Sequence, residues 1–389
     1  MKIKKVISVY LSGFLVGVAL VLFPAAGNLF VDTNFHGFTS AQYGSIFLPQ
    51  IVFAIFSSLS APKVAKKVGM KKVMLYGLIA LFFSMLLLFV SNWLMAGSFD
   101  YIIILLATAF IGIGFGFTIT ALNPFAYDLF PGKETSAVTA MHIMLGLGTA
   151  SSAILLNQFL SSGYWWGAPA LVSLLLLLMF FFTIITPLTL TSQEKEAKSN
   201  KKGIPKRIWL FALAVFLYGA CEATFGNFGA VFLEKEGGLS VAKASVGLSL
   251  FWGGITVGRV LFTFVALKFS TNKLFAIAPF VVSLVFFLLP SAQNEFMLLL
   301  CMFLGGLGLS FLFPKSISAA TDEFPKYAAL ISGALVAAIQ MGTGLSSNIL
   351  GTFNKYYSLS SLLQFSSIYA LVLGILVSYL MIAKKKKPL

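Results

Sequence analysis

The sequence predicts an all-α membrane protein with twelve transmembrane helices in two pseudo-symmetric six-helix bundles. Hydrophobic residues make up 59% of the 389 residues, and charged residues make up only 10%. Soluble chains are about 45–50% apolar and about 25% charged. The apolar residues form twelve long runs, and the second six runs repeat features of the first six. This composition excludes an ordinary soluble enzyme, because little of the chain is suited to contact with water.

Each apolar run is long enough to cross a bilayer as a helix, which takes about 20 residues. The runs cover residues 6–29, 41–61, 73–94, 101–126, 135–160, 165–191, 208–233, 242–267, 273–291, 295–319, 326–351 and 359–383. The alternating segments of about ten residues that are typical of a β-barrel do not occur. The first run follows three lysines, as in a secretory signal, but its length of about twenty residues favours an uncleaved span.

The basic residues predict the orientation of these spans. If the N-terminus is cytoplasmic, all but four of the 27 Lys and Arg residues fall in cytoplasmic loops or tails. The exceptions are Lys235, Lys243, Lys355 and Arg259. Cytoplasmic loops of membrane proteins carry the excess of positive charge. We therefore expect a multi-pass protein of the cell (inner) membrane with both termini inside, and we attribute the net charge of +15 to this topology rather than to nucleic-acid binding.

The chain divides in the middle into two related halves. Residues 192–207 form its longest polar stretch, which predicts a cytoplasmic linker between bundles at 1–191 and 208–389. The glycine-rich stretch 112–117 matches 306–311, and the same shift carries Asp128 to Asp322 and Gly148 to Gly342. An internal duplication explains why the same shift along the sequence accounts for all of these matches. Repeats of this kind are typical of secondary transporters, whose site lies between the halves near the midplane.

This organisation resembles the major facilitator superfamily over the whole chain. Within it, several motifs resemble the fucose permease-like (fucose:proton symporter) group. They are residues 112–116 with Asn123-Pro124, 129–133, 145–148, 222–226 and 251–259. The resemblance implies a secondary active transporter, working by alternating access, that moves a small polar organic solute, with a sugar or sugar-like compound as the first guess and protons as the coupling ion.

Three departures from the family patterns qualify this expectation. The loop at 62–70 has Lys66 where the superfamily usually has an Asp. No proline follows Gly148, whereas drug antiporters carry a Gly-Pro motif in the fifth span. Proton-coupled fucose permeases carry acids in spans one and four, and these spans have none here. These departures disfavour fucose itself, that coupling route and a drug-export function.

Glu222 is the one acid deep inside a predicted span. Glu222 lies 15 residues after Arg207, which corresponds to about 22 Å along a helix. A charge near the bilayer centre costs at least about 2.5–3.5 kcal/mol, so such a residue is a candidate for function. Helical spacing puts Tyr218 and Phe225 near it. We expect Glu222 to carry protons, to bind a substrate hydroxyl, or both, beside these aromatic rings; a protonated Glu bonded to a neighbouring helix is the structural alternative.

Arg259 is the one basic residue well inside a span. It could bind an anionic substrate, pair with Asp322 or Glu323 near the inner end of span ten, or extend to the membrane interface. We favour a structural or gating pair, and Asp128 is the counterpart of Asp322 in the first half.

Several uncharged polar residues lie inside predicted spans. His142 titrates near neutral pH, so a proton role and a plain hydrogen-bonding contact between helices both remain open. Unpaired amides in hydrocarbon are costly, so some must line a polar cavity while others bridge helices. The amides are Gln50, Asn123, Asn227 and Gln340, of which Asn123 and Gln340 are the stronger candidates for a substrate site.

The sequence offers no metal-binding cluster, and Cys221 and Cys301 both lie in apolar runs. No Walker motif occurs, so direct use of ATP is not expected. We expect no cofactor, no enzymatic activity, no nucleic-acid partner, a monomer, and lipid contacts by the basic tail 384–387. Two alternatives stay open: a multidrug or metabolite efflux transporter of the same fold, and a non-transporting membrane receptor or assembly factor.

Overall fold

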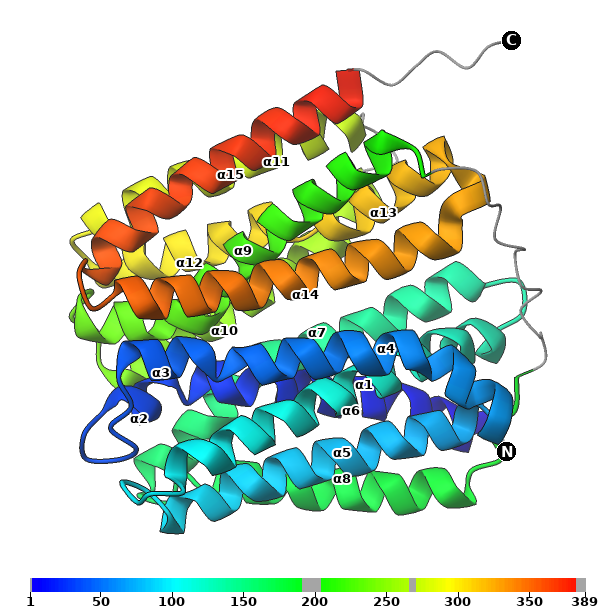
Figure 1. Cartoon of the computed structure of the whole chain (residues 1–389), viewed down its shortest axis with the longest axis horizontal. Helices are drawn as coiled ribbons and strands as arrows, with labels where there is room; N and C mark the ends of the chain where they lie inside the picture. The colour runs from blue at the N-terminus through cyan, green and yellow to red at the C-terminus, as the bar shows by residue number, and fades with distance from the viewer. Residues whose placement is uncertain (1, 191–203, 266–270, 383–389) are drawn as a thin grey trace.

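The computed structural model describes residues 2–190, 204–265 and 271–382, and the regular structure in these ranges is helical (Figure 1). The first half holds α1 (Lys2–Ala25), α2 (Gly27–Val31), α3 (Ser40–Ser45), α4 (Phe47–Val68), α5 (Met70–Val90), η1 (Ser91–Trp93), α6 (Asp100–Leu129), α7 (Glu134–Ser161) and α8 (Gly167–Ile185). The second half holds α9 (Lys206–Lys235), α10 (Val241–Val265), α11 (Thr271–Leu288), η2 (Leu289–Ser291), α12 (Glu295–Leu309), α13 (Leu312–Glu323), η3 (Pro325–Tyr327), α14 (Ala328–Phe353) and α15 (Leu359–Ile382).

The helices have the length and surface of membrane spans. Eleven helical segments of the described residues are long and apolar enough to cross a bilayer. The 26-residue α14 takes the remaining predicted position in chain order, and its length corresponds to about 39 Å. Large apolar side chains such as Leu178, Phe287 and Ile375 are more than half exposed, as contact with lipid requires. The predicted all-α membrane fold is confirmed.

Equivalent helices of the two halves pack in the same way. The pairs α1–α7, α4–α6 and α5–α8 of the first half correspond to α9–α14, α10–α12 and α11–α15 of the second. A Cβ on Gly148 would lie 2.1 Å from the Phe14 carbonyl oxygen, and one on Gly342 would lie 2.0 Å from that of Phe216. These two glycines were matched in sequence by the predicted duplication. Their shared role, direct backbone contact between helices, explains why both positions are glycine.

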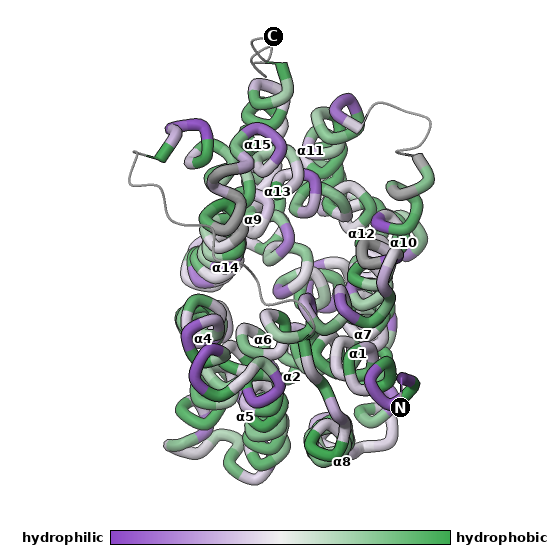
Figure 2. The backbone as a smooth tube through the Cα atoms, turned by 90° about the vertical axis from the view of Figure 1, so that its right-hand side faces the viewer, coloured by the Kyte–Doolittle hydropathy of each residue, from purple (hydrophilic) through white to green (hydrophobic). Residues whose placement is uncertain are grey.

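Most of the contact between the two halves is made by two pairs of membrane spans. On one side α14 packs against α3 and α4, and on the other α7 packs against α10. Figure 2 shows the two pairs from the end where both chain termini lie, with α9–α15 above and α1–α8 below. We call this end the termini end, and the end that holds α2 and α3 the opposite end.

The contact between the halves is closest at the opposite end. There Ser40 Oγ donates a hydrogen bond to Asn354 Oδ1 at 2.7 Å. A Cβ on Gly44 would lie 2.3 Å from the Ser347 carbonyl oxygen, whereas one on Gly333, nearer the termini end, would meet only Leu59 at 3.9 Å. The helices α4 and α14 accordingly diverge toward the termini end (Figure 1).

The predicted linker at 192–207 and the basic tail at 384–387 lie largely or wholly outside the described residues. Helix α9 begins at Lys206, within the last residues assigned to that linker.

Candidate functional site

Tyr218 and Glu222 form a hydrogen-bonded pair in the middle of α9. Their i, i+4 spacing places both on one face of the helix. The Tyr218 hydroxyl donates to Glu222 Oε2. Tyr218 is buried, with its ring stacked on Phe313 of α13 at a centroid distance of 6.1 Å, and Glu222 is half-buried. The sequence-based prediction that these two side chains lie together agrees with this geometry.

Arg259 of α10 reaches the same place. Its Nε donates to the Ser310 carbonyl oxygen at 3.1 Å, where the chain passes from α12 to α13. In a continuous helix the Ser310 carbonyl would accept from the residue four positions on, which is Pro314 and has no N–H. Arg259 therefore supplies a donor that the backbone lacks. Its guanidinium also acts electrostatically on Glu222 and lies within hydrogen-bonding reach of the Tyr218 hydroxyl.

The first half contributes His142 and Asn123 to this region. His142 Nε2 of α7 lies 3.1 Å from Asn123 Oδ1 of α6, and both side chains are half-buried. Arg259 acts electrostatically on His142 as well, so the first half meets the second here. We call Asn123, His142, Tyr218, Glu222 and Arg259 the central polar cluster. It offers charge, hydrogen-bond donors and acceptors, and two groups that can exchange protons.

The other predicted amides have different surroundings. Gln50 of α4 is 8% exposed, and its Oε1 is buried without a hydrogen-bond partner. Asn227 Nδ2 donates to Ser347 Oγ of α14 at 2.7 Å, and its carbonyl accepts from the Tyr43 hydroxyl of α3, so it ties the halves together at the opposite end. Gln340 of α14 is half-buried, and no hydrogen bond of its side chain is among the described contacts.

Phe225 lies away from the central polar cluster. It is fully buried and stacks on Phe286 of α11 at 4.2 Å and on Phe251 of α10 at 5.3 Å. Phe225 follows Tyr218 by seven residues, which is about two helical turns. Both side chains therefore lie on the same face of α9, but they contact different neighbours. Phe225 therefore packs the interior of the second half.

Glu323, one of the two acids proposed as a partner of Arg259, pairs with Arg207. Glu323 accepts two hydrogen bonds from Arg207, at 2.6 and 3.1 Å, because α9 starts beside the end of α13. Asp322 is exposed. Asp128 is half-buried near the end of α6 and makes an interaction of its own.

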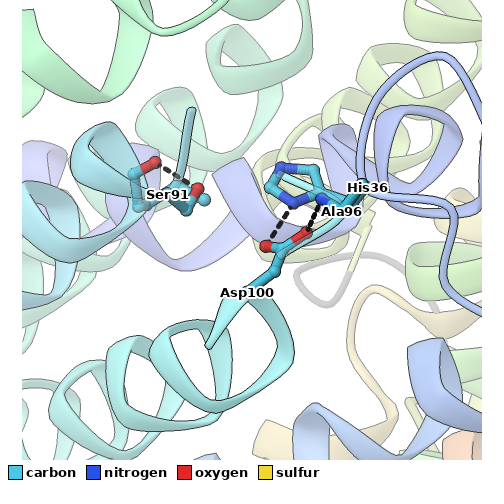
Figure 3. A network of polar contacts seen from close by, with 5 residues as sticks. His36, Ser91, Ala96 and Asp100 are labelled. Carbon is cyan, nitrogen blue, oxygen red and sulfur yellow. Dashed lines mark hydrogen bonds and ion pairs between the residues drawn. The ribbon is translucent and has the colours of Figure 1, made fainter. Parts of the chain in front are cut away.

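No sequence pattern singled out His36, yet it forms a buried pair with Asp100 at the opposite end (Figure 3). His36 Nδ1 lies 2.7 Å from Asp100 Oδ1, and their side chains are 0% and 3% exposed. Asp100 Oδ2 accepts from the Ala96 N–H at 3.0 Å, which holds Ala96 at a φ of 57°. We call this the His36–Asp100 clasp. Burial lowers the pKa of His36, although Asp100 opposes that effect.

A duplicated bundle of membrane helices with polar side chains collected between its halves defines a secondary transporter. The model of the Major Facilitator Superfamily matches residues 6–278 and, in a second match, residues 211–389. The chain belongs to the Major Facilitator Superfamily and is a multi-pass membrane transporter rather than an enzyme.

Relatives of known activity fit this assignment. The chain is 24% identical to the glucose/mannose transporter GlcP of Bacillus subtilis (strain 168) over 347 residues, which are 84% of each protein. The crystal structure of the nucleoside transporter NupG has a TM-score of 0.76 at 16% identity, covering 97% of this chain and 98% of that one. The fucose:proton symporter FucP of E. coli has a TM-score of 0.58 at 16% identity, covering 97% and 100%. The expected likeness to the fucose permease-like group is confirmed.

Proposed function

We propose that this transporter imports a sugar or sugar-like solute together with protons, and that Glu222 carries the proton. One observation carries the proposal: a membrane-embedded carboxyl is bonded to Tyr218 and lies in the field of Arg259, where the two halves meet. An ionisable group inside a membrane bundle is expensive to maintain unless it has a task.

The chemistry of the cluster suits exchange between a proton and a solute. While Glu222 is ionised, Arg259 and the Tyr218 hydroxyl stabilise its charge. Protonation removes that charge and leaves the guanidinium in need of another acceptor, which a sugar hydroxyl can supply. His142 and Asn123 offer a donor and an acceptor from the first half, and the unpartnered Gln50 Oε1 offers another acceptor. Gln340 remains a candidate contact on α14.

In this proposal the termini end is cytoplasmic, because the basic loops and tails belong to it. The contacts at the opposite end then close the external side, and the divergence of α4 from α14 corresponds to an inward-open state (Figure 1). Residues 1–191 and 208–389 would rock against each other as two bodies joined by the linker 192–207. We propose that a single chain suffices, since both halves of the site come from one polypeptide.

The relatives support the choice of solutes and of the coupling ion. GlcP is named a glucose/mannose transporter and FucP a fucose:proton symporter, so glucose, mannose and fucose are the first sugars to test. Nucleosides follow because of the likeness to NupG.

The test uses purified protein in liposomes with radiolabelled sugars. Accumulation driven by an imposed pH gradient requires coupling, whereas exchange of labelled for unlabelled solute does not. We expect Glu222→Gln to retain exchange and to lose accumulation. Glu295→Gln, a change of the same kind at an exposed residue of the opposite end, is the matched control and should keep both.

Undiminished accumulation by Glu222→Gln would remove Glu222 from coupling. The result that favours the efflux alternative has two parts. None of the sugars is taken up in response to the pH gradient, and lipophilic cations are transported away from the membrane side that corresponds to the cytoplasm.

A further inference from the structure

The surface where α4 meets α5 at the termini end is densely basic. Five of the ten residues 63–72 are lysine, and the sequence has no acid between Asp32 and Asp100. A single residue, Gly69, joins the two helices. Its N–H donates to the Ala65 carbonyl oxygen at 2.8 Å, and its own carbonyl accepts from the Lys72 N–H at 3.1 Å. The last turn of α4 and the first turn of α5 therefore adjoin, and we call residues 63–72 the basic corner.

Three lysines of the basic corner remain available to a ligand. Lys71 Nζ donates to a carbonyl oxygen at the end of α8 at 2.8 Å, and Lys66 makes an interaction of its own. Lys63, Lys67 and Lys72 are exposed, and their side chains have no ion pair or hydrogen bond within the part of the chain that the structure describes. Like charges so close together repel one another, so an anion placed among them is stabilised.

On α4 the basic corner continues into an apolar stripe. Steps of three and four residues put Lys63 and Lys67 on one helix face with Val52, Phe56 and Leu59. These three apolar side chains are all more than half exposed, and Phe56 is 66% exposed. The exposed stripe therefore changes from apolar to basic as α4 approaches the termini end.

A second stripe of the same kind runs along α5. Lys72, Tyr76 and Phe83 share one face by the same helical spacing, and all three are exposed. The buried faces of α4 and α5 both pack against α6, so the two exposed stripes are directed outward from it. Figure 2 shows both helices at one edge of the molecule, with α6 on their inner side.

A charged head beside exposed apolar stripes matches the chemistry of a lipid. Lysine clusters directly next to a membrane span attract anionic lipids. We propose that the basic corner binds an anionic phospholipid, with its phosphate among Lys63, Lys67 and Lys72 and its acyl chains along the two stripes. Lys63 and Lys67 are one helical turn apart, and the Gly69 turn brings Lys72 to the same end. Lysine side chains extend along apolar surface to reach a polar head group.

The charge balance of the basic corner selects against a zwitterionic lipid. In phosphatidylcholine the phosphate is compensated by its own quaternary ammonium group, which three lysines would repel. Phosphatidylglycerol carries a net negative charge and no cation. The apolar stripes in turn favour a lipid over a soluble phosphate, because an anion without acyl chains makes no use of them.

Binding is tested on the purified full-length protein in a neutral detergent, with native mass spectrometry counting the bound lipids. The probe is dioleoylphosphatidylglycerol. Dioleoylphosphatidylcholine has the same chains without the net charge, and glycerophosphoglycerol is the same head group without chains. We expect saturable binding of the probe and at least tenfold weaker binding of both controls. Equal binding of the two lipids would overturn the proposal, and equal binding of glycerophosphoglycerol would replace the lipid with a soluble phosphate.

Two triple variants separate the basic corner from the overall charge. Combining Lys63→Gln, Lys67→Gln and Lys72→Gln should weaken phosphatidylglycerol binding at least tenfold, which corresponds to about 1.4 kcal/mol. The control changes three exposed lysines scattered over the termini end, and it should bind like the unaltered protein. These are Lys4, Lys133 and Lys206, each changed to Gln. An equal loss in both triple variants, or no loss in the first one with its thermal unfolding normal, would contradict the proposal.

Photo-cross-linking locates the bound lipid directly. Phosphatidylglycerol with a diazirine in its acyl chain is added to the protein in liposomes, and the labelled peptides are identified after illumination. We expect labelling to concentrate on the stripes that contain Phe56 and Tyr76, and to fall at least tenfold there in the first triple variant but not in the control. The phosphatidylcholine analogue should label the lipid-facing helices without this preference. The same labelling pattern for both lipids would show that the basic corner does not select the anionic one.

Discussion

Asp100 and Glu222 are both acids with close polar partners, and their settings differ. Asp100 of the His36–Asp100 clasp has both oxygens satisfied, one by His36 and one by the Ala96 N–H. Aromatic rings of Phe30, Phe38 and Trp165 surround the histidine. All of these groups belong to the first half, so the clasp moves as one body with it.

Glu222 of the central polar cluster is only half-buried, and Arg259 of α10, which acts on it, also acts on His142 of the first half. Any rocking of the halves changes its surroundings. The comparison indicates that burial and a short contact alone do not mark a functional acid. An acid suited to transport also lies where mobile parts of the protein meet and where a solute can reach it.

The sharpest test of this distinction is the removal of Arg259. Loss of a hydrogen bond to a charged group costs about 1.5–3 kcal/mol, so we expect Arg259→Gln to reduce sugar uptake by about 10- to 100-fold. Restoring neutrality with Glu222→Gln in the same chain should recover thermal stability but not proton-driven accumulation. Uptake within twofold of normal in Arg259→Gln would show that the cluster resembles the clasp and is structural.

The converse change is made in the clasp. Asp100→Ala leaves the donors of His36 and Ala96 without an acceptor, and we expect it to lower the free energy of unfolding by about 3 kcal/mol. Exchange and accumulation per folded molecule should stay within about twofold of normal. Denaturant unfolding in detergent measures the first quantity and liposome assays the second. A selective loss of coupling without loss of stability would make the clasp functional.

Phe225 separates packing from solute binding within α9. Because its ring is stacked between Phe251 and Phe286, Phe225→Leu should destabilise the protein by about 1–2 kcal/mol. Its KM for sugar should be unchanged, whereas Tyr218→Phe, which removes the hydroxyl bonded to Glu222, should alter coupling. A large rise in KM for Phe225→Leu would show that Phe225 contributes to substrate binding.

The smallest expected effect is a pH dependence of stability from His36. Burial lowers the pKa of His36 in the folded protein below its ordinary value of 6.5. The unfolded chain therefore binds this proton more readily, so the contribution is fully present above about pH 6.5 and is lost as the pH falls. His36→Gln, which keeps a donor for Asp100, should lose less stability between pH 8 and pH 5. An equal loss in both proteins would assign the dependence to other groups.

Much of the architecture was readable from the sequence, because the bilayer imposes simple rules. Runs of about 20 apolar residues predict the spans, and helices are found at all twelve predicted positions. The shift that matches Gly148 with Gly342 predicted the duplication, and the equivalent packing of α1–α7 and α9–α14 agrees with it. Glu222 could be singled out because a charge in hydrocarbon is costly at any rotation of its helix.

Only the tertiary structure decided which side chains meet. Lipid and protein interior are both apolar, so the hydrophobic pattern of a membrane helix says little about which face points inward. Helix rotation and crossing therefore determined that Arg259 acts electrostatically on Glu222 while Glu323 pairs with Arg207, and that Phe225 packs away from the cluster. The His36–Asp100 clasp depends on how a loop and a helix end fold over one another, for which the sequence holds no periodic signal.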